Sequence, residues 1–138
     1  IPKNLEDMPW IKHLVLSHLK LVNVPTLPPN LETLDLSFNI LRQMPILPPT
    51  LKNLNCSSNK LWRLTLPPSL ENFNCASNEF RCLPTLPSTL KTLDCSDNKL
   101  QEFPTLPKSL KTLNCSLNLL AELPKFPSTL ECLSINWY

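Results

Sequence analysis

The fold of this chain is decided by one stretch, Leu90-Lys91-Thr92-Leu93-Asp94-Cys95-Ser96-Asp97-Asn98-Lys99-Leu100. Its skeleton, L-x-x-L-x-C-x-x-N-x-L, returns about every twenty residues along almost the whole sequence. A segment that recurs at this period is typical of a solenoid, in which each copy forms one turn of a stack. We therefore expect residues 11–138 to form a single solenoid domain with an incomplete last repeat. Residues 1–10 lack the skeleton and are expected to cap the N-terminal end.

The centre of each copy predicts a short strand in a parallel sheet. Leu93 and Cys95 alternate with Thr92 and Asp94, and this period of two places the apolar pair inside and the polar pair outside. Such a short strand cannot bury its apolar side alone, so the equivalent strand of the next copy must lie beside it. The expected strand centres are Leu14, Leu34, Leu54, Phe73, Leu93, Leu113 and Leu133.

The segment between strands is rich in proline, as in Leu83-Pro84-Thr85-Leu86-Pro87. Proline fixes φ and pushes the preceding residue toward β or polyproline II geometry, so we expect an extended return path with little helix. The chain has 16 prolines and no glycine, which implies that asparagine or ordinary extended backbone makes the bends. One copy, with Leu64-Thr65-Leu66-Pro67-Pro68, lacks a proline and is one residue short, which predicts a local kink there.

An asparagine follows each central strand at the point where the chain turns inward. The amide side chain carries both donors and an acceptor, so a stacked row can satisfy the backbone groups that lose their sheet partners there. We interpret this row as a structural ladder rather than a ligand site. Its members are Asn39, Asn59, Asn78, Asn98 and Asn118.

Four of the six cysteines occupy the same apolar position in consecutive copies and are expected to be buried free thiols. Neighbouring strands lie about 4.8 Å apart, so thiols in a line cannot surround a zinc ion tetrahedrally. Their Cβ vectors run side by side, which also disfavours disulfides. Reduced thiols indicate a reducing compartment such as the cytosol. The four are Cys56, Cys75, Cys95 and Cys115, whereas Cys82 and Cys132 fall at variable, partly exposed positions.

The skeleton L-x-x-L-x-L-x-x-N-x-L is similar to that of leucine-rich repeats over nearly the whole chain. The shorter motif in Leu86-Pro87-Ser88-Thr89-Leu90 resembles the bacterial subclass found in YopM-like and IpaH-like secreted effectors. This resemblance implies a right-handed solenoid of the α/β class, here mostly β, with an extended outer side. Cysteine at positions such as Cys115 departs from the bacterial pattern and also resembles short repeats of protist and large-virus proteins.

The outward residues of the strands should form the concave face of the stack. They are small, neutral and able to form hydrogen bonds, which fits either a solvated sheet face or a docking surface for a partner protein. Interface hot spots favour aromatic residues, so two flanking aromatics are added as possible anchors. The candidate partner-binding residues are Asp35, Phe38, Asn53, Asn55, Asn72, Asn74, Thr92, Asp94, Thr112, Asn114 and Trp137.

Several other classes of function are disfavoured. The two histidines, His13 and His18, have no expected carboxylate or cysteine partner, so neither a catalytic site nor a metal or other cofactor is predicted. The net charge is only +2, and lysines such as Lys52 alternate along the solenoid with glutamates such as Glu71, which disfavours nucleic acid. No apolar run approaches the roughly 18 residues of a membrane span.

Three hypotheses remain for the role of the chain. The first is recognition of a partner protein, which the effector resemblance would make a host protein met in the host cytoplasm after secretion. The second, implied by the resemblance to IpaH-like effectors, is a substrate-recognition domain of a larger ubiquitin-ligase effector. The chain begins at Ile1 and is expected to be an excised domain or processed product. The third is self-assembly, in particular a homodimer through the open C-terminal strand.

Overall fold

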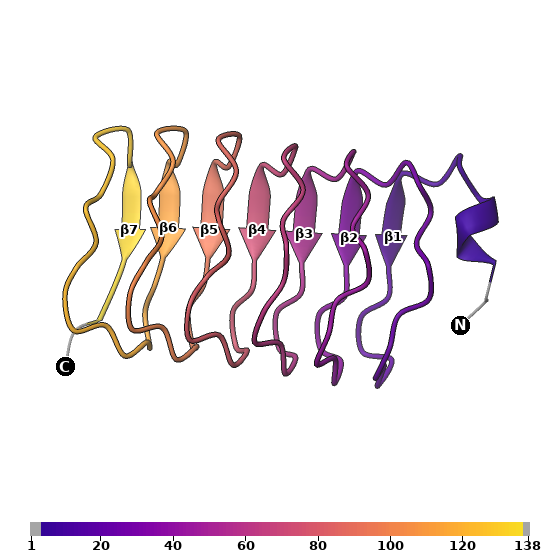
Figure 1. The fold of residues 1–138 in the computed structure, drawn as a ribbon, viewed down its shortest axis with the longest axis horizontal. Helices are drawn as coiled ribbons and strands as arrows, with labels where there is room; N and C mark the ends of the chain where they lie inside the picture. The colour runs from indigo at the N-terminus through magenta and orange to yellow at the C-terminus, as the bar shows by residue number, and fades with distance from the viewer. Residues whose placement is uncertain (1–3, 137–138) are drawn as a thin grey trace.

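The structure, a computed structural model, describes residues 4–136. Within this range one 3-10 helix, η1, precedes seven short strands, β1 to β7, joined by extended segments (Figure 1). The helix spans Leu5–Asp7, and the strands span His13–Val15, Thr33–Asp35, Asn53–Asn55, Asn72–Asn74, Thr92–Asp94, Thr112–Asn114 and Cys132–Ser134.

The seven strands form one parallel sheet in the order β1-β2-β3-β4-β5-β6-β7. Equivalent residues pair directly, so Leu34 lies between Leu14 and Leu54. The middle residue of each strand from β2 to β6 is buried, while its two neighbours face outward and are partly or fully exposed. The expected strand centres and the parallel solenoid are therefore confirmed.

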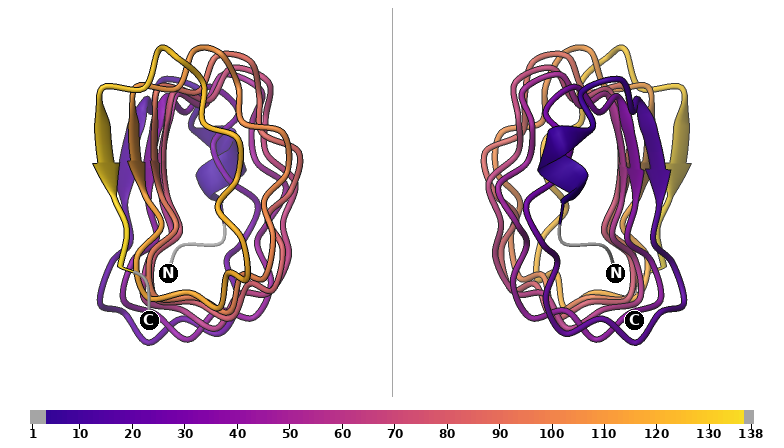
Figure 2. Two further views of the ribbon diagram at one scale, coloured as in Figure 1. Left: turned by 90° about the vertical axis from the view of Figure 1, so that its left-hand side faces the viewer. Right: turned by 90° about the vertical axis from the view of Figure 1, so that its right-hand side faces the viewer.

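The chain winds as a right-handed coil. In the left view of Figure 2 the strands run downward and the return segments run upward on the opposite side, while successive turns advance toward the viewer. In both views of Figure 2 the first and last strands are displaced sideways, away from the return segments, relative to the middle strands. The sheet is thus the concave side of the solenoid, and the extended return segments form the convex outer side.

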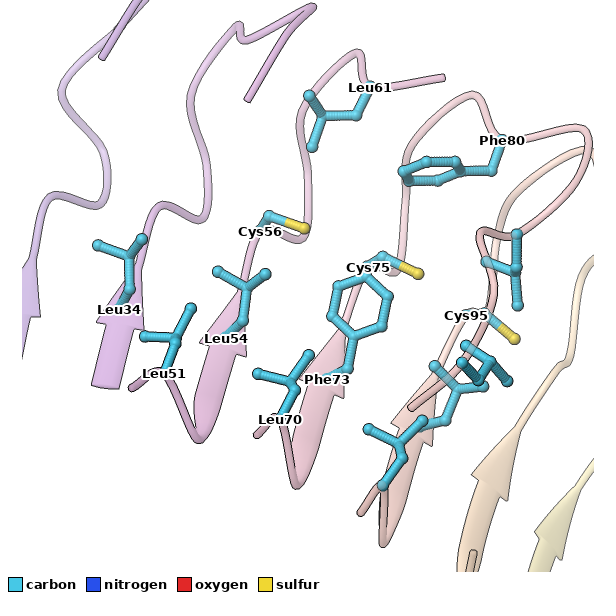
Figure 3. Close-up of a cluster of buried hydrophobic side chains, with 14 of the residues drawn as sticks. Leu34, Leu51, Leu54, Cys56, Leu61, Leu70, Phe73, Cys75, Phe80 and Cys95 are labelled. Carbon is cyan, nitrogen blue, oxygen red and sulfur yellow. The ribbon is translucent and has the colours of Figure 1, made fainter. Parts of the chain in front are cut away.

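The core is a continuous column of apolar side chains shared between turns. Leu34, Leu54 and Phe73 lie in one row, and Cys56, Cys75 and Cys95 lie in a second row (Figure 3). Each buried leucine contributes about 2 kcal/mol through the surface that it removes from water. No turn can supply this burial by itself, because both neighbouring turns provide the covering atoms.

The bends are made by left-handed residues, which differs from the expectation that asparagine or ordinary extended backbone makes them. Within the described chain, all residues with positive φ are non-glycine and have φ between 54° and 57°. Most precede a ladder asparagine directly, because the chain must reverse there while the asparagine itself turns into the stack. The seven residues are His18, Lys20, Phe38, Ser58, Ser77, Asp97 and Leu117.

The left-handed turn at Leu117 predicts a stabilising substitution. Leucine with positive φ costs about 1–2 kcal/mol, and glycine removes this cost while adding about 0.5–1 kcal/mol of unfolded-state entropy. Leu117 is half exposed, so little packing is lost. We expect Leu117→Gly to raise the free energy of unfolding, measured by urea denaturation, by about 0.5–1 kcal/mol. The matched control Leu119→Gly, at an exposed residue without positive φ, should lower it instead.

The shortened copy leaves the sheet undisturbed. Asn53 pairs with Asn72 in register even though the two are 19 residues apart, against 20 for Thr33 and Asn53. The missing residue is absorbed entirely by the outer segment between β3 and β4. The expected irregularity therefore lies on the convex side and not in the strands.

The ends of the solenoid differ. Near the N-terminus η1 lies beside the first turn (Figure 1), and Leu5 is buried. Trp10, which lies in a turn within the segment expected to cap this end, is 69% exposed. At the other end all three residues of β7 are exposed, including Leu133.

Candidate functional site

A shallow groove lies along the concave face of the sheet. It has a volume of about 590 Å³ and crosses β2 to β6, with Ser134 of β7 at its end. The floor consists of the outward side chains on either side of each buried strand centre. The candidate residues that line it are Asp35, Asn53, Asn55, Asn72, Asn74, Thr92, Asp94, Thr112 and Asn114.

The first outward position of four consecutive strands forms a hydrogen-bonded chain. Asn53 Nδ2 donates to Thr33 Oγ1 at 3.3 Å, and Asn72 Nδ2 donates to Asn53 Oδ1 at 2.5 Å. Thr92 Oγ1 then donates to Asn72 Oδ1 at 2.6 Å. The bonds fix the orientation of both amides, so this half of the groove is organised before any ligand arrives.

The second outward position is held by bonds within each turn. Asp94 Oδ1 accepts from the backbone N–H of Ser96 at 3.1 Å and from its hydroxyl at 2.7 Å. Asn74 Oδ1 accepts from the N–H of Ala76 at 3.0 Å, and Asp35, Asn55 and Asn114 do the same two residues on. Within the described part of the chain, the second oxygen of each of these aspartates and the amide nitrogen of each of these asparagines have no hydrogen-bond partner. Each therefore offers one rigidly placed polar atom at this face.

Phe38, one of the two flanking aromatics, is not among the residues that line this groove. Phe38 lies beyond the end of β2 at a left-handed residue, which directs its ring along the edge of the stack. There it stacks on His18, with ring centroids 4.4 Å apart and planes 9° apart. A role for Phe38 as a binding anchor stays a prediction. Trp137 lies outside the described residues.

The asparagine row joins each turn to the one before it. Asn78 Nδ2 donates to the carbonyls of Cys56, Cys75 and Ala76 at 3.0–3.2 Å, and its Oδ1 accepts from the N–H of Leu61 at 2.9 Å. The same pattern recurs along the stack. The equivalent donors are Asn39, Asn59, Asn98 and Asn118.

A second ladder was not foreseen. A hydroxyl three residues before each strand from β3 to β7 donates to a backbone carbonyl of the preceding turn, as Ser109 Oγ does to Leu90 O at 2.6 Å. The sequence carries a signal for it, since serine or threonine recurs at this position from the second turn onward. The other hydroxyl donors are Thr50, Ser69, Thr89 and Thr129.

The cysteine row, formed by Cys56, Cys75, Cys95 and Cys115, consists of neutral thiols with low reactivity. Burial raises the pKa of Cys56 to about 12 and that of Cys115 to about 11. Burial also raises the pKa of Cys75 and Cys95, with smaller contributions from neighbouring thiols and from Asp94. Because the thiolate is the nucleophile and the metal ligand, these neutral thiols are packing groups. Cys82 and Cys132 are exposed, and all six cysteines are free.

The edge that precedes the strands carries charges of both signs. Glu32 lies 3.9 Å from Lys12 and 3.7 Å from Lys52, and Glu71 lies 3.0 Å from Lys91. The glutamate side chains are 32–33% exposed and the lysine side chains 51–65% exposed. Ion pairs between such exposed groups contribute little to stability. The row therefore keeps the edge hydrated rather than forming a basic stripe.

Neither a metal cluster nor a membrane-spanning helix emerges from residues 4–136. No group of three or more His, Cys, Asp or Glu side chains in this part of the chain is placed to hold a metal ion. The helical structure in the same range is too short to cross a lipid bilayer.

Comparison with known proteins identifies the repeat. The profile of the Leucine Rich Repeat family matches residues 30–54, 50–73 and 89–111, which include β2, β3 and β5 and most of β4. This chain contains leucine-rich repeats. A search of the curated proteins found no match for this leucine-rich-repeat chain.

Solved structures of bacterial effectors are similar to this leucine-rich-repeat chain. A leucine-rich-repeat domain of a Shigella effector is 39% identical with a TM-score of 0.85, over 90% of this chain and 57% of that one. YopM from Yersinia enterocolitica is 36% identical with a TM-score of 0.91, over 96% and 30%. YopM from Yersinia pestis, a leucine-rich effector protein, is 31% identical with a TM-score of 0.75, over 94% and 44%.

The chain therefore spans between about a third and somewhat more than half of the length of these structures. Its fold is that of a protein-interaction module similar to bacterial effector domains. Leucine-rich-repeat solenoids are typically recognition scaffolds without enzymatic activity.

Proposed function

We propose that the concave groove over β2 to β6 binds a segment of a partner protein. The observation that carries the proposal is the double row of pre-oriented polar side chains along one continuous groove. A ligand that meets rigid side chains loses less conformational entropy on binding, which favours affinity. Because the Asn, Asp and Thr side chains of the groove are short, a peptide or loop has room to approach the sheet.

The similarity to secreted effector domains supports a host protein as the partner. On this proposal the chain acts in the host cytoplasm, where free thiols such as the exposed Cys82 stay reduced. A role as the recognition part of a larger ubiquitin ligase rests on the family resemblance and stays a prediction.

Charging the middle of the groove tests the proposal. Asn74 lies on the central strand β4, and Asn74→Arg places a long cation over the neighbouring polar rows. We expect this variant to lose at least about tenfold in affinity for a partner captured with the unmodified chain, a change of about 1.4 kcal/mol. Affinity purification followed by titration calorimetry of the recovered partner would measure the change.

The matched control makes the same chemical change elsewhere. Asn23 is exposed and lies outside the groove, so Asn23→Arg is expected to keep partner binding within about twofold. Equal losses in both variants, with the fold of each intact by circular dichroism, would contradict binding through the concave face.

The exposed strand β7 favours a second candidate, self-association. Its residues are all exposed and Leu133 presents an apolar side chain at an unpaired edge, and such edges pair readily with another chain. We expect light scattering to show a monomer–dimer equilibrium that shifts with concentration. A lysine at the strand centre, Leu133→Lys, should leave only monomer, and a concentration-independent mass for the unmodified chain would exclude this candidate.

A further inference from the structure

A groove lies on the convex side of the solenoid at the shortened turn. The outer segments that follow β2 and β3 enclose a volume of about 640 Å³, lined by residues 42–47, 49 and 63–68. Leu27, Leu86 and Leu106 occupy equivalent outer positions in other turns and are buried, at 5–7% exposure. Leu47 and Leu66, which line the groove, are only partly buried. A strip of the core is thus partly uncovered at this turn.

The rim of this groove carries an apolar side chain where other turns carry polar ones. Ile46 is 94% exposed. The equivalent exposed residues of the other turns are Thr26, Thr65, Thr85, Thr105 and Lys125. A fully exposed isoleucine beside partly uncovered leucines makes a continuous apolar strip, which marks a binding surface more clearly than scattered exposed residues do.

The charges at the groove have one sign. Arg42 and Arg63 line it, no carboxylate does, and neither arginine forms an ion pair within the described chain. The guanidinium of Arg63 lies 4.6 Å from the centre of the Trp62 ring, which holds it in place. A similar outer groove of about 680 Å³ near β6 has Glu102 and Glu122 balanced by two lysines. Unbalanced positive charge is therefore particular to the groove at the short turn.

We propose that this convex groove is a second docking surface, which binds an extended peptide segment of a partner protein that alternates apolar side chains with carboxylates. Carboxylates pair with the two arginines, for which a planar guanidinium is well suited. The apolar side chains of the peptide cover Ile46 and enter between Leu47 and Leu66. The peptide runs extended because the two groove walls are themselves parallel extended segments.

A synthetic peptide tests this directly. The probe is a fluorescein-labelled heptapeptide in which leucine and aspartate alternate, titrated with the full chain by fluorescence anisotropy at 0.15 M salt. We expect saturable binding that falls at least about tenfold in the double variant Arg42→Glu, Arg63→Glu. The control Arg81→Glu, at an exposed arginine outside the groove, should change affinity by no more than about twofold.

Three further arms separate the groove from simple charge attraction. Insertion of proline between Leu64 and Thr65 restores the full repeat length and changes how the two walls of the groove face each other, so we expect it to weaken binding about tenfold. Peptides with serine for leucine or with lysine for aspartate should bind equally poorly. Asn74→Arg should leave peptide binding unchanged, which distinguishes this surface from the concave one.

Other outcomes would overturn the proposal. These are no binding at millimolar protein, an equal loss in Arg81→Glu, or equally tight binding of the serine peptide or a thymidine oligonucleotide. The last result would identify a site for polyanions in general. Circular dichroism of every variant establishes that a loss of binding reflects the surface and not the fold.

Discussion

Replacing Asn78 by alanine is expected to lower the free energy of unfolding by about 3 kcal/mol, measured by urea denaturation. The side chain makes four hydrogen bonds, two of them to groups of the preceding turn. Its removal leaves the N–H of Leu61 and the carbonyl of Cys56 without this partner in a buried place, and each unsatisfied group costs about 1–3 kcal/mol. The loss also weakens the contact between two turns, so the unfolding transition should broaden.

Two controls define this result. Asn23→Ala removes an exposed asparagine and should change stability by less than about 0.5 kcal/mol. Asn78→Asp keeps the acceptor for Leu61 but replaces the donors by an oxygen that faces three carbonyls, so it should destabilise the fold at neutral pH at least as much as alanine. A small effect of both Asn78 variants would show that water replaces the amide.

The chain is expected to lose stability steeply above pH 9. The four buried thiols have raised pKa values in the folded state, about 12 for Cys56 and about 11 for Cys115 against an ordinary value of 9.0. Between these values the folded thiols keep their protons while the unfolded ones release them, so stability falls as pH rises. Each thiol contributes about 1.4 kcal/mol per pH unit, and the four together about 5 kcal/mol per unit.

Removing single thiols tests this account. Urea titrations from pH 8 to 10.5 should show a slope about 1.4 kcal/mol per unit smaller for Cys56→Ala than for the unmodified chain. The control Cys82→Ala removes an exposed cysteine outside the buried row and should leave the slope as it is. Identical slopes for all three proteins would contradict a role for the cysteine row in alkaline unfolding.

Most of the framework could be predicted from residue types. Alternation around Leu93 places one side chain inside and its neighbours outside, and the repeat period sets the register. The groove residues Asn53, Asn72 and Thr92 follow from that register alone, because outward positions of paired strands must share a face. Their mutual hydrogen bonds could not be predicted, because a repeat pattern does not determine which way an amide rotates.

The left-handed bends also escaped prediction. Phe38, Ser58 and Asp97 share a backbone geometry but no side-chain property. Glycine normally marks such positions in a sequence, and this chain has no glycine, so nothing in the sequence indicated the bends.

The convex groove was missed for a different reason. The short copy indicated an irregularity, but whether the outer wall closes over a missing residue depends on packing among Leu47, Leu66 and their neighbours.

The shortened turn has a wider consequence for how the molecule can be modified. Because β3 and β4 stay in register although the segment between them is one residue shorter, the alignment of the sheet does not depend on the length of that segment. We therefore expect insertions or deletions in the outer wall between β3 and β4 to leave the concave groove in place. Two unrelated ligands could thus bind to the two sides of this small solenoid at the same time and independently of each other.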